Sequence, residues 1–157
     1  MSDIKNDLKR FLTNHQKALA SLDFNNLYFG WLQYSSDYPP SKSMSLLSKV
    51  LMSVGLKPWT YLTSIEIYSF YRLKGLGDVV LNPDVEGIYD GAFAYSDINT
   101  IKIPDTIKYI EINAFEGSYL KTIYYMGSRD NFIKVLENSG WSRIQIENIL
   151  KYCLFNK

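Results

Sequence analysis

Hydrophobic and polar positions repeat at a fixed spacing between residues 76 and 127. Apolar residues in the segment 98–115 recur 22 residues upstream, in the segment 76–93, and a third copy begins at residue 120. The matching pairs are Leu76 and Ile98, Val79 and Ile101, Leu81 and Ile103, Val85 and Ile107, Ile88 and Ile110, Ala92 and Ala114, and Phe93 and Phe115. A period of this length is typical of stacked repeats. The pattern therefore predicts a short solenoid.

Each copy begins with the alternation of a β-strand that is buried on one face. Ile101 and Ile103 alternate with Thr100 and Lys102, and the pair Pro104-Asp105 favours a turn directly afterwards. We expect strands at 78–81, 100–103 and 122–125 to lie side by side in a small parallel sheet. Phe115 should stack on Phe93, because both occupy the same position in successive copies.

A degenerate earlier copy precedes these repeats. The segment 62–70 matches the segment 85–93 at a spacing of 23 residues, with Ser69 in place of the alanine and Phe70 in place of the phenylalanine. Its strand is missing from the sequence. The chain therefore predicts about three coils, of which the first is incomplete.

Helical patterns precede the repeats. The segment 3–20 has an apolar stripe that includes His15, with Ser2 as its expected N-cap, and Asp23 should cap a second helix. Paired prolines predict a loop over 35–40, followed by a third helix over 43–54.

Two more helices are expected after the repeats. Ser128 should cap a helix over 131–138, and the capping box at Ser142 begins a last helix that reaches about Leu154. The predicted fold is therefore α+β: an N-terminal helical cap (1–57), a repeat solenoid (58–127) and a C-terminal helical cap (128–157). No flexible linker separates these parts, so they should form one cooperative unit.

Charge is distributed unevenly along the chain. Residues 1–75 carry nine Lys and Arg against five Asp and Glu, residues 76–127 carry three against eight, and residues 128–157 carry five against three. The net charges are thus +4, −5 and +2, which sum to the overall +1. An acidic repeat does not suit the backbone of a nucleic acid, and no apolar stretch is long enough for a membrane helix.

The N-terminal segment 1–7 is polar and lacks the apolar core of a signal peptide. A single cysteine, Cys153, permits no internal disulfide, which suits a reducing compartment. These two features predict a cytoplasmic location.

The repeat resembles the BspA-like class of leucine-rich repeats. The resemblance depends on the segment 100–107, on Ile110, on the pair Ala114-Phe115 and on the earlier Gly91-Ala92-Phe93. Pro83 stands one place later than Pro104 does in its copy, and the cysteine common after the Ala-Phe pair is absent. Short cytosolic versions with a helical front end resemble proteins carried by bacteriophages. The resemblance thus implies an accessory protein that binds and modulates or inhibits a host defence or nucleic-acid enzyme.

Candidate catalytic residues are few. His15 is the only histidine and lies on an apolar stripe, which favours a packed or hydrogen-bonded role. Cys153 falls on the apolar face of the expected last helix, where an inert thiol is favoured over a nucleophile. Asp84, Glu86 and Asp90 match no calcium-loop spacing. We therefore expect no enzyme activity, no cofactor and no metal.

Three functional interpretations remain open: a protein-interaction module, an enzyme assembled from scattered residues, and a structural or adhesive repeat. We favour the first, with another protein as partner and without direct binding of nucleic acid or membrane. The expected binding residues are those that alternate with the buried ones in the three strands: Asp78, Val80, Thr100, Lys102, Thr122 and Tyr124. A competing patch is the basic, aromatic N-terminal part, with Tyr28, Trp31 and Tyr34.

Overall fold

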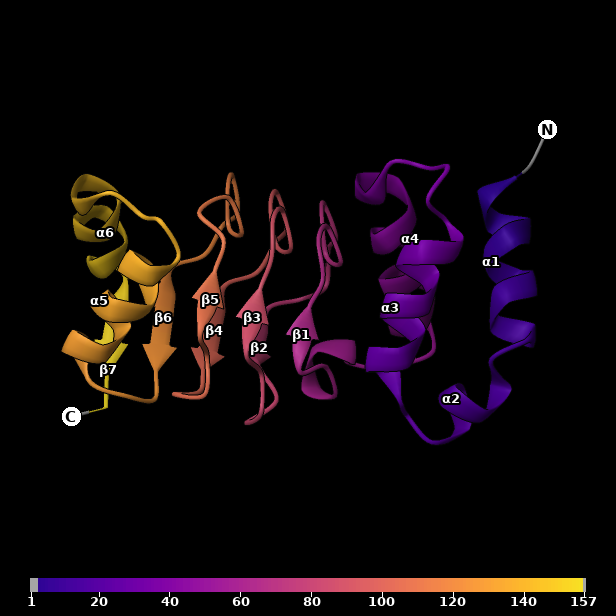
Figure 1. Ribbon diagram of the computed structural model, residues 1–157, viewed down its shortest axis with the longest axis horizontal. Helices are drawn as coiled ribbons and strands as arrows, with labels where there is room; N and C mark the ends of the chain where they lie inside the picture. The colour runs from indigo at the N-terminus through magenta and orange to yellow at the C-terminus, as the bar shows by residue number, and fades with distance from the viewer. Residues whose placement is uncertain (1–2, 157) are drawn as a thin grey trace.

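A computed structural model describes residues 3–156, and its elements follow one another along one long axis (Figure 1). Four helices occupy the N-terminal end: α1 (Ile4–Thr13), α2 (Gln16–Ala20), α3 (Phe24–Tyr34) and α4 (Pro40–Ser53). The strands fill the middle, and α5 (Arg129–Asn138) and α6 (Arg143–Leu150) lie at the C-terminal end. The fold combines helices with small parallel sheets, as the sequence predicts.

Two parallel sheets run through the repeat region. One has the order β2 (Asp78–Val80), β4 (Thr100–Ile103), β6 (Thr122–Tyr125) and β7 (Cys153–Phe155). The other has the order β1 (Ser64–Ile65), β3 (Gly87–Ile88) and β5 (Tyr109–Ile110). Up to β6, strands of the two sheets alternate along the chain. The predicted side-by-side pairing of 78–81, 100–103 and 122–125 is confirmed, although the first strand ends one residue earlier, at Val80.

Equivalent side chains of successive repeats meet in the core because the register is constant. Val79 pairs with Ile101, which pairs with Ile123, and all three are buried. In the second sheet, Ile88 pairs with Ile65 on one side and with Ile110 on the other. This second sheet was not predicted, since its strands are only two residues long and leave no alternation in the sequence.

Phenylalanine rings form a ladder through the core. The rings of Phe70 and Phe93 lie 5.3 Å apart and 10° from parallel, and those of Phe93 and Phe115 lie 5.7 Å apart and 7° from parallel. The predicted stacking is therefore confirmed. Phe70 and Phe93 are fully buried, whereas Phe115, at the end of the ladder, is only half-buried.

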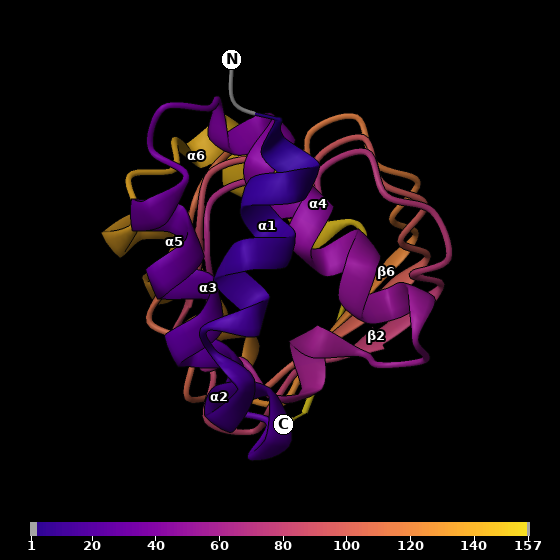
Figure 2. The same cartoon turned by 90° about the vertical axis from the view of Figure 1, so that its right-hand side faces the viewer.

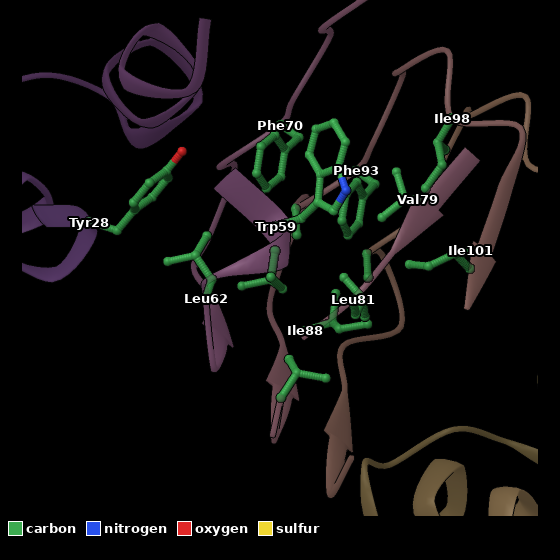
Figure 3. Close-up of a cluster of buried hydrophobic side chains, with 14 of the residues drawn as sticks. Tyr28, Trp59, Leu62, Phe70, Val79, Leu81, Ile88, Phe93, Ile98 and Ile101 are labelled. Atoms are coloured by element: carbon green, nitrogen blue, oxygen red, sulfur yellow. The ribbon is translucent and has the colours of Figure 1, made fainter. Parts of the chain in front are cut away.

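The incomplete first copy has a 3₁₀ turn where a strand would otherwise lie. This turn, η1 (Pro58–Thr60), runs beside the start of the second repeat, where Asn82 donates its backbone N–H to the Trp59 oxygen at 3.3 Å. The Trp59 ring meets Phe70 edge-on at 5.6 Å, and the ring of Tyr28 from α3 lies 6.4 Å from Phe70 (Figure 3). One continuous core thus joins the helices to the repeats.

Two predictions about the N-terminal helices are wrong. The segment 3–20 is broken at Asn14 and His15, where the His15 ring stacks on Phe11 at 4.0 Å and its Nδ1 donates to the Phe11 oxygen at 2.7 Å. The third helix begins at Pro40, since the first position of a helix needs no backbone donor. The expected cap Ser2 lies outside the described residues, and Asp3 caps α1 by accepting from the Lys5 N–H at 3.0 Å.

The prediction that the last helix reaches Leu154 is also wrong. The capping box at Ser142 is confirmed, but α6 ends at Leu150 and the chain then forms β7. Backbone bonds join β7 to β6: Ile123 N–H donates to the Tyr152 oxygen at 2.8 Å, and Asn156 N–H to the Tyr125 oxygen at 3.1 Å. An unpaired strand edge needs cover, and here a strand supplies it where a helix was expected.

Candidate functional site

The outward face of the sheet β2-β4-β6 holds all six residues that the sequence singles out. Asp78, Val80, Lys102 and Tyr124 are exposed, while Thr100 and Thr122 are half-buried. Their alternation with the core residues Val79, Ile101 and Ile123 is the cause, because successive side chains of a strand point to opposite faces. The structure therefore brings the six together on one face.

The first row on this face is polar and internally bonded. Asp78 pairs with Thr100, and Thr100 pairs with Thr122. Oδ1 of Asp78 accepts from Thr100 Oγ1 at 2.8 Å and from Asn99 Nδ2 at 3.1 Å. These bonds hold the Asp78 carboxylate in one orientation and leave its other oxygen available to a partner.

The second row is more apolar and has a fourth member. Val80 pairs with Lys102, Lys102 with Tyr124, and Tyr124 with Leu154 of β7. Val80 is 54% exposed, Tyr124 is 41% exposed and Leu154 is 56% exposed. Four strands at about 4.8 Å spacing make this row about 14 Å long. Sequence reasoning missed Leu154 because it assigned that residue to a helix; the period-two pattern of Cys153 and Phe155 around it was the available signal.

Lys102 is the only cation of this second row. It forms no ion pair with any residue between 3 and 156, so its ammonium is available to a partner. Lys108, which precedes β5 of the other sheet, pairs with Glu86 at 2.7 Å, and this exposed pair contributes little to stability. An exposed valine, tyrosine and leucine around one unpaired lysine offer apolar contact area together with one charge.

Neither candidate catalytic residue has a reactive environment. His15 packs on Phe11 as described above. Cys153 lies in β7, not on a helix, and its Sγ donates to the Ile149 oxygen at 3.3 Å. Burial raises the pKa of the Cys153 thiol to about 12, so the nucleophilic thiolate is scarce at neutral pH.

The acidic residues of the repeats do not form a metal site. Within the described range, no group of three or more His, Cys, Asp and Glu side chains is placed to hold a metal ion. Glu86 pairs with Lys108, and Asp90 accepts from the Tyr68 hydroxyl at 3.4 Å. The Tyr68 pKa is raised, first by burial and then by the Asp90 charge.

The competing aromatic patch is not a surface, so that alternative is wrong as stated. Tyr28 and Trp31 are fully buried: the Tyr28 hydroxyl lies 2.6 Å from Ser48 Oγ, and Trp31 Nε1 donates to the Ser43 oxygen at 2.7 Å. Only Tyr34 is exposed, with its ring stacked on Trp31 at 5.9 Å. Their spacing placed all three on one helix, but α3 is covered from two sides.

No helix among residues 3–156 combines the length and apolar character that crossing a membrane requires. Comparison with curated proteins finds no match, and comparison with solved structures finds none either. The family model described as BspA type leucine rich repeat region matches residues 52–155, in six copies. That range is well over half of the 157 residues and includes both sheets. The chain therefore belongs to the BspA type leucine-rich repeat family.

Proposed function

We propose that this protein is a non-enzymatic interaction module that binds another protein through the outward face of β2, β4, β6 and β7. Leucine-rich repeats generally mediate contacts between proteins, and the regular faces of repeat proteins are common binding surfaces. A short solenoid of about three coils, closed at its ends by helices, is the form of the module that we propose.

One observation carries the proposal: the row Val80, Lys102, Tyr124 and Leu154 is exposed and in register on four neighbouring strands. Solvated strands usually present polar side chains, whereas three of these four are apolar or aromatic. Tyr124 is the expected anchor, since tyrosine is enriched at interface hot spots and loses little conformational entropy on binding. The bonded Asp78 carboxylate beside the row would help to fix the orientation of the partner.

The biological setting is part of the same proposal. A phage-encoded accessory protein in the host cytoplasm, which binds and modulates or inhibits a host enzyme, is what the helical front end and the few repeats imply by resemblance. An enzyme or an adhesive repeat is the alternative. The former would require a reactive cluster, and the described residues offer neither an activated thiol nor a metal-binding group.

Affinity purification from the cell that encodes the protein tests the proposal. A Tyr124→Ala, Lys102→Glu double variant should lose the protein that the parent retains, because truncating a hot spot costs at least about 2 kcal/mol, or roughly thirtyfold in affinity. Tyr119→Ala with Lys134→Glu, which lies on α5, is a matched control away from the row, and it should retain the partner. Equal retention by both variants would place the interface elsewhere.

A further inference from the structure

Residues of α1, α2 and α4 line a groove. These helices belong to the N-terminal end of the molecule, which faces the viewer in Figure 2. The volume of the groove is about 610 Å³. Its apolar lining consists of Leu8, Leu12, Leu19, Leu46 and Val50, of which Leu8 is buried and the other four are half-buried. Four half-exposed aliphatic side chains in one furrow form an apolar surface that the fold itself leaves uncovered.

The groove exists because α1 and α4 both pack on α3. Phe11 of α1 fills the space beside Gly30, where an added Cβ would come within 3.3 Å of the ring. On the other side, α4 holds α3 through the bonds that Ser48 and Ser43 make with Tyr28 and Trp31. The two walls are therefore fixed by a shared neighbour, and the space between them is preformed.

The hydroxyl groups in the lining turn away from a ligand. Thr13 donates its hydroxyl to the Lys9 oxygen at 2.8 Å, and Ser53 donates to the Val50 oxygen at 2.5 Å. Both hydroxyls are thus used within their own helices. Carbon atoms, the lysine ammonium groups and the Gln16 amide remain as the features that a ligand would meet.

All the charge in the lining is positive. Lys5 and Lys9 lie one turn apart on α1, and Lys49 faces them from α4. None of the three forms an ion pair within residues 3–156, and no carboxylate lines the groove. Two acids are close in sequence: Asp3 accepts from the Lys5 backbone N–H at 3.0 Å, and Asp7 accepts from the Tyr38 hydroxyl at 2.6 Å and pairs with Arg10 at 3.6 Å.

We propose that this groove is a second binding site, which takes an amphipathic helix of a partner protein whose apolar stripe is flanked by carboxylates. Two helices that form the walls of an apolar groove are the usual receptor for such a helix, with anchors at positions i, i+3, i+4 and i+7. Because α1 has ten residues, the groove is about 15 Å long and matches about three turns of ligand. Carboxylates on the two edges of the ligand would meet Lys5 and Lys9 on one wall and Lys49 on the other.

A synthetic probe tests this inference without knowledge of the natural partner. The probe is a fluorescein-labelled 14-residue peptide with a leucine stripe and flanking glutamates, and its matched form has lysines in place of the glutamates. Fluorescence polarisation should show the glutamate peptide binding at least about tenfold more tightly, with an affinity that falls as salt rises. The Lys5→Glu, Lys9→Glu, Lys49→Glu variant should weaken it at least about thirtyfold.

Three further variants make the result specific. A Lys121→Glu, Lys134→Glu, Lys151→Glu variant changes the net charge equally in the later repeats and the C-terminal part, and it should bind the peptide as the parent does. A Leu46→Gln, Val50→Gln variant removes apolar contact from half-buried positions and should weaken binding without unfolding the protein. Tyr124→Ala should leave peptide binding unchanged, so failure of the strand-face proposal and failure of this one are distinguishable.

The inference is overturned if the glutamate peptide does not bind, or if both charge variants weaken it equally. It is also overturned if phosphatidylglycerol vesicles, and not the peptide, bind the parent and are lost by the groove variant, because the occupant is then a membrane surface. Dimerisation of the parent that the groove variant abolishes, without peptide binding, would identify a second copy of the chain as the occupant.

Discussion

Side chains of the repeat region meet their own counterparts from neighbouring repeats, whereas side chains of the N-terminal helices meet unrelated residues. Phe93 lies between Phe70 and Phe115, and the constant register of the strands likewise places Ile101 between Val79 and Ile123. In the helices, Tyr28 meets Ser48 and Trp31 meets the Ser43 backbone. The comparison teaches that the constant step from one repeat to the next determines both the core and the outward rows of the repeats. Each contact between the helices, in contrast, is specific to its own pair of residues.

The largest expected loss of stability comes from a substitution that removes the central ring of the phenylalanine ladder. Phe93→Ala removes a fully buried ring with a stacked neighbour on each side, and should cost about 3–5 kcal/mol. Against a total stability of about 5–15 kcal/mol, this threatens folding. Phe115→Ala should cost less, because that ring is half-buried at the end of the ladder. Urea unfolding measures both; Tyr119→Ala, at a site 74% exposed, is the control, and a parent-like midpoint for Phe93→Ala would contradict the ladder.

A specific helical contact should cost less and should depend on its partner. Tyr28→Phe leaves the buried Ser48 hydroxyl without its bond, at a cost of about 1–3 kcal/mol. Adding Ser48→Ala should recover part of that loss, which a double-mutant cycle measures as coupling. Burial raises the Tyr28 pKa far above its ordinary value, so the cost should be the same across about pH 6–9. Purely additive losses would show that the bond does not couple the two helices.

Substitution of one glycine in the repeats should test the contact between neighbouring copies through its effect on stability. Gly91 has φ +63°, and a Cβ there would lie 2.3 Å from Tyr68 Cε1 in the preceding copy. Gly55, with φ +87° and nothing within 4 Å, is the matched control. Gly91→Ala should therefore cost about 1–2 kcal/mol more than Gly55→Ala. Removing the ring as well, in Gly91→Ala with Tyr68→Ala, should reduce the difference, and equal costs for both single variants would refute the contact.

The smallest expected effect is on partner binding, for substitutions of the two candidate catalytic residues. His15→Ala and Cys153→Ala should leave partner binding within about twofold of the parent as long as the variants remain folded. The raised thiol pKa also predicts that Cys153 reacts more slowly with a thiol reagent at pH 8 than the unfolded chain does. Loss of effect in a folded Cys153→Ala protein would favour an enzyme.

The sequence predicted the repeat region well because each copy of the repeat gives independent support for the same structural positions. Seven matching pairs at one spacing, together with the start of a third copy, predict β2, β4 and β6, their register and their outward residues. The second sheet was missed because two-residue strands have no period of their own. In the helical part, burial depends on tertiary cover, so the stripe of Tyr28, Trp31 and Tyr34 did not reveal that two of these rings are enclosed.

The end of the candidate site escaped prediction for a related reason. The segment 143–154 has helical spacing, and only pairing with the edge of β6 turns its last part into β7. That pairing is a long-range event, and the only local signal for it is the short period-two pattern of Cys153 and Phe155 around Leu154. The place of Leu154 beside Tyr124 in the outward row was therefore not predicted from the sequence. The N-terminal groove escaped in the same way, because it depends on how far apart two helices stand on a third.

Titration of the purified partner against single-residue variants tests the central claim most directly. Tyr124 and Tyr119 are both exposed tyrosines, but only Tyr124 lies in the outward row of the sheet. Measured by calorimetry, Tyr124→Ala should weaken binding by roughly thirtyfold or more, and Tyr119→Ala should stay within about twofold of the parent. Parent-like affinity for a folded Tyr124→Ala protein would contradict the account and move the interface away from the strand face.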